Sequence, residues 1–254
     1  MAGHSKWHNI KHRKAAADAK RGKLWSKCAK AIMVAAKNGG PDPETNLALR
    51  YAIDEARYAN MPRETIERNI KKGVGEIGGE DWESIRYEGY GAGGVAIVVE
   101  ALTNNRTRTA VEVRNAFSKY GGNLGTTGCV SYMFALKGVI TLPASTPEDK
   151  LMEAALEAGA EDVKPPEGDA ESSGDWQVYT APTALHAVRD ALEKAGLTVT
   201  DARLDNIPTT TVQVTGDTAR SVLKLVEALE DNDDVQKVYA NFDIPDSELA
   251  ALES

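Results

Sequence analysis

Apolar residues recur at helical spacing from the N-terminus of this chain to Gly73, where the regularity ends. One helix is predicted over residues 20–37, because the Asn-Gly-Gly that follows is a strong helix stop. Asp42 is predicted to cap a second helix that has a proline at its first position and runs to about Ala59. A third helix follows and ends at Gly73. Three short helices with tight connections predict a small helical bundle.

Strand and helix patterns alternate after Gly73. The glycine-rich stretch 74–94 is predicted to be a hinge followed by irregular structure. Residues 95–134 then predict the order β-α-β, with CVSYMF as the second strand, and residues 209–244 predict another β-α-β unit. Residues 137–206 predict the order β-α-β-β-α-β, which is the ferredoxin-like order.

The predicted fold class is therefore an α+β multidomain protein. It consists of an N-terminal helical bundle plus two α+β domains, one of which is ferredoxin-like and inserted in the other. The predicted boundaries are 1–78 for the basic helical domain, 79–135 with 207–246 for the discontinuous α+β domain, and 136–206 for the inserted domain.

Charge is distributed very unevenly along the chain. The whole chain carries −8, yet residues 1–37 hold ten Lys or Arg against Asp18 alone, and residues 38–72 add equal numbers of basic and acidic residues. The segment 1–72 thus carries +9 and the remainder −17. Such asymmetry indicates a polyanion-binding segment attached to an acidic body. The alternative is a lysine-rich, solvated helix face without a partner.

The helix predicted over residues 20–37 has two distinct faces. Lysines recur on one side at spacings of three, four, three and seven, and Leu24, Cys28, Ile32 and Ala35 lie on the other. The basic side comprises Lys20, Lys23, Lys27, Lys30 and Lys37.

His4, His8 and His12 precede this helix at four-residue spacing, and three interpretations compete. A single zinc ion cannot bind all three on a helix, because the outer two would stand roughly 12 Å apart along the axis. A pair could bind one, but no Cys, Asp or Glu is near to complete the site. A mitochondrial transit peptide would be rich in Arg and Ser, whereas lysine dominates here. Donors and a stacking tryptophan for nucleic acid are favoured.

No catalytic motif stands out in the remaining sequence. Gly89, Gly91 and Gly94 match the dinucleotide-binding letters but precede a strand, so a turn is predicted. EDNDDVQ, residues 230–236, is predicted to be a solvated turn and His186 a surface residue. Arg106 and Arg108 lie at a predicted strand-to-helix turn and could contact phosphate, or could pair with the acidic body. We expect no enzyme activity, no metal and no cofactor.

The apolar runs are far shorter than the roughly 20 residues that span a bilayer, and no signal-peptide core follows the basic start. Cys28 and Cys129 lack metal or disulfide spacing. We therefore expect a cytoplasmic protein without membrane association.

Several long stretches together resemble the YebC family: AGHSKWHNIKHRKAAADAKRGKLWSK, ANMPRETIERNIKKGVGE, YEGYGAGGVAIVVEALTNNRTRTAVEVRNAFSKYGGNLG and VSYMF. The resemblance covers nearly the whole chain. The family includes bacterial transcriptional regulators and the mitochondrial translational activator of cytochrome c oxidase. The resemblance implies a three-domain, non-enzymatic protein. One departure is Ala92, where the family usually has proline.

The predicted function is a nucleic-acid-binding, non-catalytic regulatory factor, and the resemblance implies a DNA-binding transcriptional regulator. The alternative is a ribosome-associated translation factor that binds ribosomal RNA and relieves stalling at proline-rich sequences, and the charge distribution does not separate the two. An enzyme that uses the cleft between the two α+β domains is a third possibility. The oligomeric state is not predicted. The expected nucleic-acid contacts are Lys6, Trp7, His8, Lys11, His12, Arg13, Lys14, Lys20, Lys23, Lys27, Lys30, Arg106 and Arg108.

Overall fold

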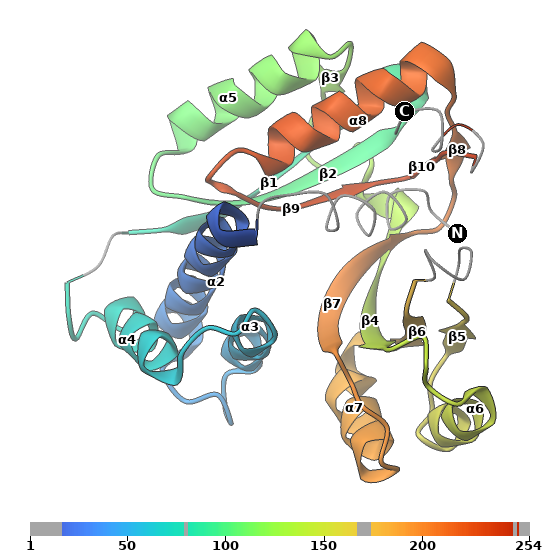
Figure 1. The fold of residues 1–254 in the computed structure, drawn as a ribbon. Coiled ribbons are helices and arrows are strands. Elements are labelled where there is room, and N and C mark those ends of the chain that lie inside the picture. The colour runs from blue at the N-terminus through green and yellow to red at the C-terminus, as the bar shows by residue number, and fades with distance from the viewer. Residues whose placement is uncertain (1–16, 79–80, 167–173, 246–247, 249–254) are drawn as a thin grey trace.

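The computed structural model describes residues 17–78, 81–166, 174–245 and 248, and side chains from Arg21 onward. Within these ranges the chain forms seven α-helices and ten strands, so the predicted α+β class is confirmed. Figure 1 shows a helical unit, a sheet covered by two helices, and a second sheet with its own two helices.

The helical unit consists of α2 (Ala17–Gly39), α3 (Leu47–Tyr58) and α4 (Arg63–Gly73). Its core contains Cys28, Ile32, Leu49 and Ile66, which are at most 6% exposed. The apolar face predicted for α2 is therefore confirmed, except at Leu24, which is 47% exposed.

The predicted start of the second helix was wrong. Residues 43–45 form a turn, and α3 is capped by Asn46, whose side chain accepts a hydrogen bond from the Leu49 N–H. The Asn46 amide also donates to the Ala35 and Gly40 carbonyls, both at 2.8 Å. Asn46 thus connects the start of α3 to the end of α2. The Asp-Pro sequence used for the prediction gives no information about these hydrogen bonds, because their acceptors lie six and eleven residues earlier in the chain.

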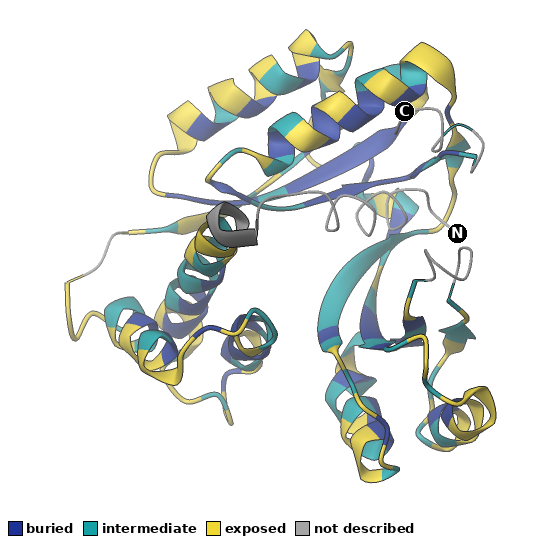
Figure 2. Ribbon diagram, in the orientation of Figure 1, coloured by how far each residue is buried: buried dark blue, intermediate teal, exposed yellow. Residues whose placement is uncertain are grey.

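A second unit is built on a four-stranded sheet of order β3-β1-β2-β9. The strands are β1 (Glu83–Tyr90), β2 (Ala96–Thr103), β3 (Asn123–Leu124) and β9 (Val235–Ala240), with all pairs antiparallel. Helices α5 (Arg106–Lys119) and α8 (Gly216–Glu230) cover one face, as Figure 1 shows. Figure 2 shows their inner faces buried and their outer faces exposed.

Strand β2 is buried on both faces, which explains its nearly continuous apolar sequence. Ile97 and Val99 pack against α5 and α8, whereas Ala96 and Val98 pack with Val130 on the opposite face.

The turn predicted at the glycine motif is confirmed. Residues 91–95 connect β1 to β2 through the short 3-10 helix η1 (Ala92–Gly94), in which Gly93 and Gly94 have positive φ. The irregular structure predicted before this turn was wrong, because residues 83–90 pair with β2 along their whole length. Glycines and charges obscured the alternation in this strand.

A third unit follows the order β4 (Phe134–Leu142), α6 (Glu148–Glu157), β5 (Asp162–Lys164), β6 (Trp176–Thr180), α7 (Leu185–Lys194), β7 (Asp201–Pro208). The sheet order is β5-β6-β4-β7, and every pair is antiparallel. The strand predicted at CVSYMF was wrong, because residues 131–133 form the short 3-10 helix η2 and β4 begins only at Phe134.

Two short strands complete the described fold. Strands β8 (Val212–Gln213) and β10 (Phe242–Asp243) pair in parallel beside the second unit. Short 3-10 helix η3 (Pro182–Ala184) precedes α7.

Helix α3 also contacts the third unit. The Tyr51 hydroxyl donates to the Pro182 carbonyl at 3.2 Å, and the Tyr51 ring stacks on His186 with centroids 4.8 Å apart. The surface position predicted for His186 was therefore wrong: its side chain is 16% exposed and lies beside Asp54, which also accepts from Arg189 at 2.8 Å. The neighbouring helical unit covers this residue, and the sequence of α7 alone does not show that cover.

Candidate nucleic-acid interface

Helix α2 presents its described lysines to the second unit. Three of them, Lys23, Lys27 and Lys30, face residues 230–234, which end α8 and lead into β9. We call residues 230–234 the acidic turn, because Glu230, Asp231, Asp233 and Asp234 make up four of its five residues. Figure 1 shows the first turns of α2 beside the sheet of the second unit.

Each of the three lysines donates to a main-chain carbonyl of the acidic turn. Lys23 Nζ lies 2.6 Å from the Asp231 oxygen, Lys27 Nζ 3.2 Å from that of Glu230, and Lys30 Nζ 2.7 Å from that of Asp233. Carbonyls at the end of a helix lack intrahelical partners and carry partial negative charge. The ammonium groups of Lys23 and Lys27 therefore satisfy carbonyls at the end of α8, and Lys30 bonds the turn that follows it.

Carboxylates of the turn add two longer ion pairs. Lys23 Nζ lies 3.3 Å from Asp231 Oδ1, and Lys30 Nζ lies 3.4 Å from Asp234 Oδ1. The Asp231 side chain is 71% exposed, so this pair is open to solvent and is energetically weak.

Lys27 occupies the middle of this contact. Burial lowers the pKa of its ammonium to about 8, helped by the neighbouring charge of Lys23 and opposed by Glu230, Asp231 and Asp233. A cation at this position thus lies in a partly desolvated site between like and opposite charges.

Asp234 joins the lysines to the turn before α5. Its Oδ2 accepts from Arg108 at 2.6 Å, from the Thr109 hydroxyl at 2.8 Å and from the Thr103 hydroxyl at 3.2 Å. Burial would raise the pKa of this carboxyl, but the Arg108 and Thr109 hydrogen bonds and the nearby charges of Arg108 and Lys30 hold it below its usual value. The prediction of a solvated turn was wrong here, since Asp234 is only 4% exposed.

The two predicted arginines differ in their surroundings. Arg108 pairs with Asp234, whereas Arg106 is 72% exposed and lies 3.9 Å from Glu83. Lys30 lies 4.3 Å from the centre of the Trp82 ring, which connects this region to the start of β1. The fold thus brings Lys23, Lys27 and Lys30 of α2 and the turn before α5 to a common junction around Asp234.

The other predicted contacts lie outside the described residues or side chains. Main-chain atoms of Lys20 are described in α2, but its side chain is not. The remaining seven are Lys6, Trp7, His8, Lys11, His12, Arg13 and Lys14, and the zinc alternative at the three histidines also falls in this segment. Among the described residues, no group of three or more His, Cys, Asp or Glu could hold a metal ion.

Sequence reasoning missed the acidic turn as a partner of the lysines. Four acids in five residues directly after a helix are a visible signal, because helix C-termini ordinarily attract cations. The chain separation of more than 200 residues concealed which cations would be attracted.

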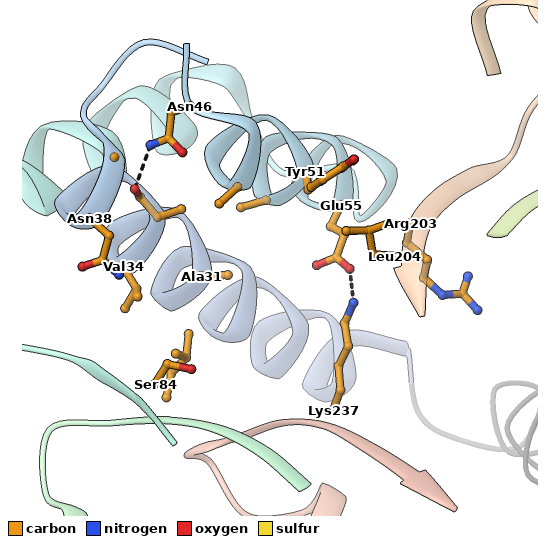
Figure 3. Close-up of a pocket in the computed structure, with 15 residues that line it drawn as sticks. Ala31, Val34, Asn38, Asn46, Tyr51, Glu55, Ser84, Arg203, Leu204 and Lys237 are labelled. Atoms are coloured by element: carbon orange, nitrogen blue, oxygen red, sulfur yellow. Dashed lines mark hydrogen bonds and ion pairs between the residues drawn. The ribbon is translucent and has the colours of Figure 1, made fainter. Parts of the chain in front are cut away.

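A cavity of about 540 Å³ lies where the three units meet. Its lining comes from α2, α3, β1, β2, β7 and β9, and Figure 3 shows Lys237 reaching toward Glu55. Its walls are mainly small apolar side chains such as Ala31, Val34 and Ala52. Its charged groups are paired: Lys237 bonds Glu55, and Arg203 bonds Asp201 and Asp205. The Lys237 pair ties β9 to α3 across the cavity.

No described helix is long and apolar enough to cross a membrane.

Comparison with known proteins identifies relatives over nearly the full chain. The model of the TACO1/YebC protein N-terminal domain matches residues 5–76, and that of the TACO1/YebC second and third domain matches residues 82–242. A probable transcriptional regulatory protein of Sulfurihydrogenibium sp. is 55% identical over 255 residues, covering 100% of both chains. Another, from Geobacter sulfurreducens, is 53% identical and covers 99% of this chain and 100% of its own.

A solved structure is similar as well. The crystal structure of a conserved hypothetical protein from Aquifex aeolicus has a TM-score of 0.81 and 51% sequence identity, covering 92% of this chain and 94% of that chain.

Proposed function

The chain belongs to the TACO1/YebC family, and on this premise we propose that it is a non-catalytic, nucleic-acid-binding regulatory factor that acts as a DNA-binding transcriptional regulator. The names of the relatives support regulation of transcription. The observation that carries the binding proposal is the charge distribution: +9 over positions 1–72 against −17 in the rest of the chain.

The described structure supports different roles for the basic residues before α2 and for those within it. Lys23, Lys27 and Lys30 already bond the acidic turn, so the basic segment before α2 supplies the first contacts. In sequence it precedes α2, whose N-terminal end lies beside the acidic turn (Figure 1). Arg106 adds an exposed cation near the same junction.

A ribosome-associated translation factor that binds ribosomal RNA is the second candidate. The observation that favours it is the chemistry of the proposed contacts, which are ammonium and guanidinium groups suited to phosphate. Such contacts carry no sequence information, so they serve structured RNA as well as duplex DNA.

We also propose the domain division 1–78, 79–135 with 207–246, and 136–206, with the last as an inserted ferredoxin-like domain. The first boundary is supported by the gap between the two family matches, which lies between residues 76 and 82. The sheet order β5-β6-β4-β7 and the position of this unit between β3 and β8 support the insertion.

The binding proposal is tested by salt-dependent titration. A variant in which Lys6, Lys11, Arg13 and Lys14 are replaced by Gln is compared with one in which Arg63, Arg68, Lys71 and Lys72 of α4 are replaced by Gln. Both lose four positive charges. The first should bind duplex DNA far more weakly, with the slope of log K against log salt reduced by about 3 to 4, because each phosphate contact contributes about 0.9. Equal weakening in both variants would refute a specific role for the N-terminal segment.

Competition separates the two candidates. The protein is bound to ribosomes and challenged with duplex DNA from promoters and with random duplex. Sequence-selective displacement by promoter DNA supports the transcriptional regulator, whereas retention on ribosomes against both duplexes supports the translation factor.

A further inference from the structure

We propose that the acidic turn is an internal competitor of nucleic acid: it occupies the lysine face of α2 in the free protein, and bound phosphates displace it. This inference rests on the proposed function and identifies how the same site is regulated. The lysine face is defined as Lys23, Lys27 and Lys30.

The chemistry of the contact resembles that of a phosphate backbone. Three ammonium groups along one helix face donate to three main-chain carbonyl oxygens of the acidic turn, at 2.6 to 3.2 Å. Asp231 and Asp234 add anionic oxygens at 3.3 and 3.4 Å. Nucleic acid offers anionic oxygens in the same kind of linear series, so the two ligands compete for the same donors.

The contact is polar and can therefore be exchanged. The apolar core residues of α2 pack within the helical unit, while those of α8 pack within the second unit, and the two clusters share no residue. The Lys23–Asp231 pair is partly exposed, and such pairs are weak and are screened by salt, whereas the side chains of Lys30 and Asp234 are only 13% and 5% exposed. Side-chain exposure is 31% for Lys23 and 71% for Asp231, which gives solvent and ligand access to this edge.

Release of the lysines leaves the acidic turn folded. Asp234 keeps its bonds to Arg108, Thr109 and Thr103, all within the second unit, and its N–H donates to the Asn232 side chain at 2.9 Å. Its ion pair with Lys30 is the contact that crosses to the helical unit. The turn is thus a preformed anionic surface that α2 can leave.

The test removes half of the acidic side chains of the competitor and leaves its main-chain carbonyls in place. The double variant Asp231→Asn/Asp233→Asn keeps the carbonyl oxygens and removes two charges beside the lysine face. The matched control is Glu153→Gln/Glu157→Gln, which removes two charges from exposed positions of α6, in the third unit. Affinity for a random 30-base-pair duplex and for a ribosomal RNA fragment is measured at low and moderate salt.

We expect the turn variant to bind roughly three- to tenfold more tightly than the wild type at low salt, and the control to change by less than about twofold. The gain should shrink as salt rises, because the internal pairs are then screened in the wild type too. Equal affinities of the turn variant and the control overturn the inference and leave the proposed function standing. Absence of binding in all three proteins overturns both.

A second readout detects the release itself without nucleic acid. Acetylation rates of individual lysines by a water-soluble succinimidyl ester are measured by mass spectrometry. In the turn variant, Lys23, Lys27 and Lys30 should react severalfold faster than in the wild type, while Lys71 and Lys119 react at unchanged rates. Unchanged rates at all of these lysines would show that the turn does not hold the lysine face, and would overturn the inference.

Discussion

At the scale of single residues, Asp234 makes more of the contacts that hold this site together than any of the residues predicted from the sequence. One carboxylate accepts hydrogen bonds from Thr103, Arg108 and Thr109 and pairs with Lys30. Satisfied buried networks of this kind hold their members in one geometry, whereas loss of one member leaves the others unpaired. The position of Arg108 is therefore set by an acid 126 residues away.

Replacing Asp234 by Asn should lower the free energy of unfolding by about 2 to 3 kcal/mol at pH 7, since Arg108 is partly exposed and rehydrates in part. Urea unfolding gives the value, and Asp231→Asn should change it by less than about 0.5 kcal/mol. The pKa of Asp234 is held below its usual 3.8, so its contribution is full above that pH and is lost as the pH falls through the folded value. A difference between wild type and variant that stays unchanged as the pH falls from 7 to 2 would contradict this assignment.

At the scale of elements, the helices show where local pattern suffices and where it does not. Helix α5 begins at the predicted strand-to-helix turn, where the Asn105 side chain caps it by accepting a hydrogen bond from the Arg108 N–H at 3.1 Å. Helix α3 begins later than predicted, because the Asn46 side chain forms hydrogen bonds with three main-chain groups and caps the helix. The Asp42 side chain instead accepts a hydrogen bond from the Glu44 N–H in the turn before the helix.

Asn46→Ala should therefore cost about 2 to 3 kcal/mol in unfolding free energy, since it removes the cap of α3 and leaves two carbonyls without their amide donor. Asp42→Ala, the cap expected from sequence, should cost about 0.5 kcal/mol, because its side chain bonds one exposed turn N–H. Equilibrium urea unfolding of both variants checks the order. A larger loss in Asp42→Ala would mean that the helix starts where the sequence pattern places it.

The packing of α3 on α7 should depend on pH through His186. Burial and the charge of Arg189 lower the pKa of its imidazole below 6.5, against the pull of Asp54. The unfolded chain then binds more protons than the folded one below about pH 6.5, so stability is full above that pH and falls as the pH drops. His186→Phe keeps the ring stack on Tyr51 and removes the titration. Between pH 7 and 5 the wild type should lose more stability than this variant, as measured by urea unfolding at both pH values. Parallel losses in both proteins would exclude His186 as the titrating group.

At the scale of the whole molecule, charged and polar pairs connect the three units alongside apolar contacts. Tyr51 and Tyr58 of α3 pack against the core of the third unit, and Phe134 of β4 packs with Val98 and Tyr239 of the second unit. Glu55 of α3 pairs with Lys237 of β9, and the Asn206 amide of β7 donates to Glu100 of β2 at 3.3 Å. Glu55 and Lys237 also line the cavity of about 540 Å³. The contact between α2 and the acidic turn consists of polar pairs and costs little to separate, which is consistent with the proposed displacement of the acidic turn by nucleic acid.

A double-mutant cycle on Glu55→Gln and Lys237→Met should give a coupling energy of about 1 kcal/mol, because both side chains are about two-thirds buried. The exposed pair Arg63 and Glu67 on α4 provides the matched control, with an expected coupling of about 0.3 to 0.5 kcal/mol. Four-protein cycles by urea unfolding measure both. Additive effects at Glu55 and Lys237, with a coupling no larger than that of the control pair, would show that the units are not coupled through this pair.

The sequence by itself determined the features that depend on periodic burial along the chain. Helical and strand spacing specified most of the elements, their order predicted an α+β multidomain fold, and the count of charges placed the basic segment at the N-terminus. Only the tertiary structure decided what the charged groups touch. Lys23 and Asp231 are 208 residues apart, and His186 is covered by a helix from another unit. Burial periodicity is local, whereas the partner of an exposed charge depends on how folded units dock, and no local pattern records that geometry.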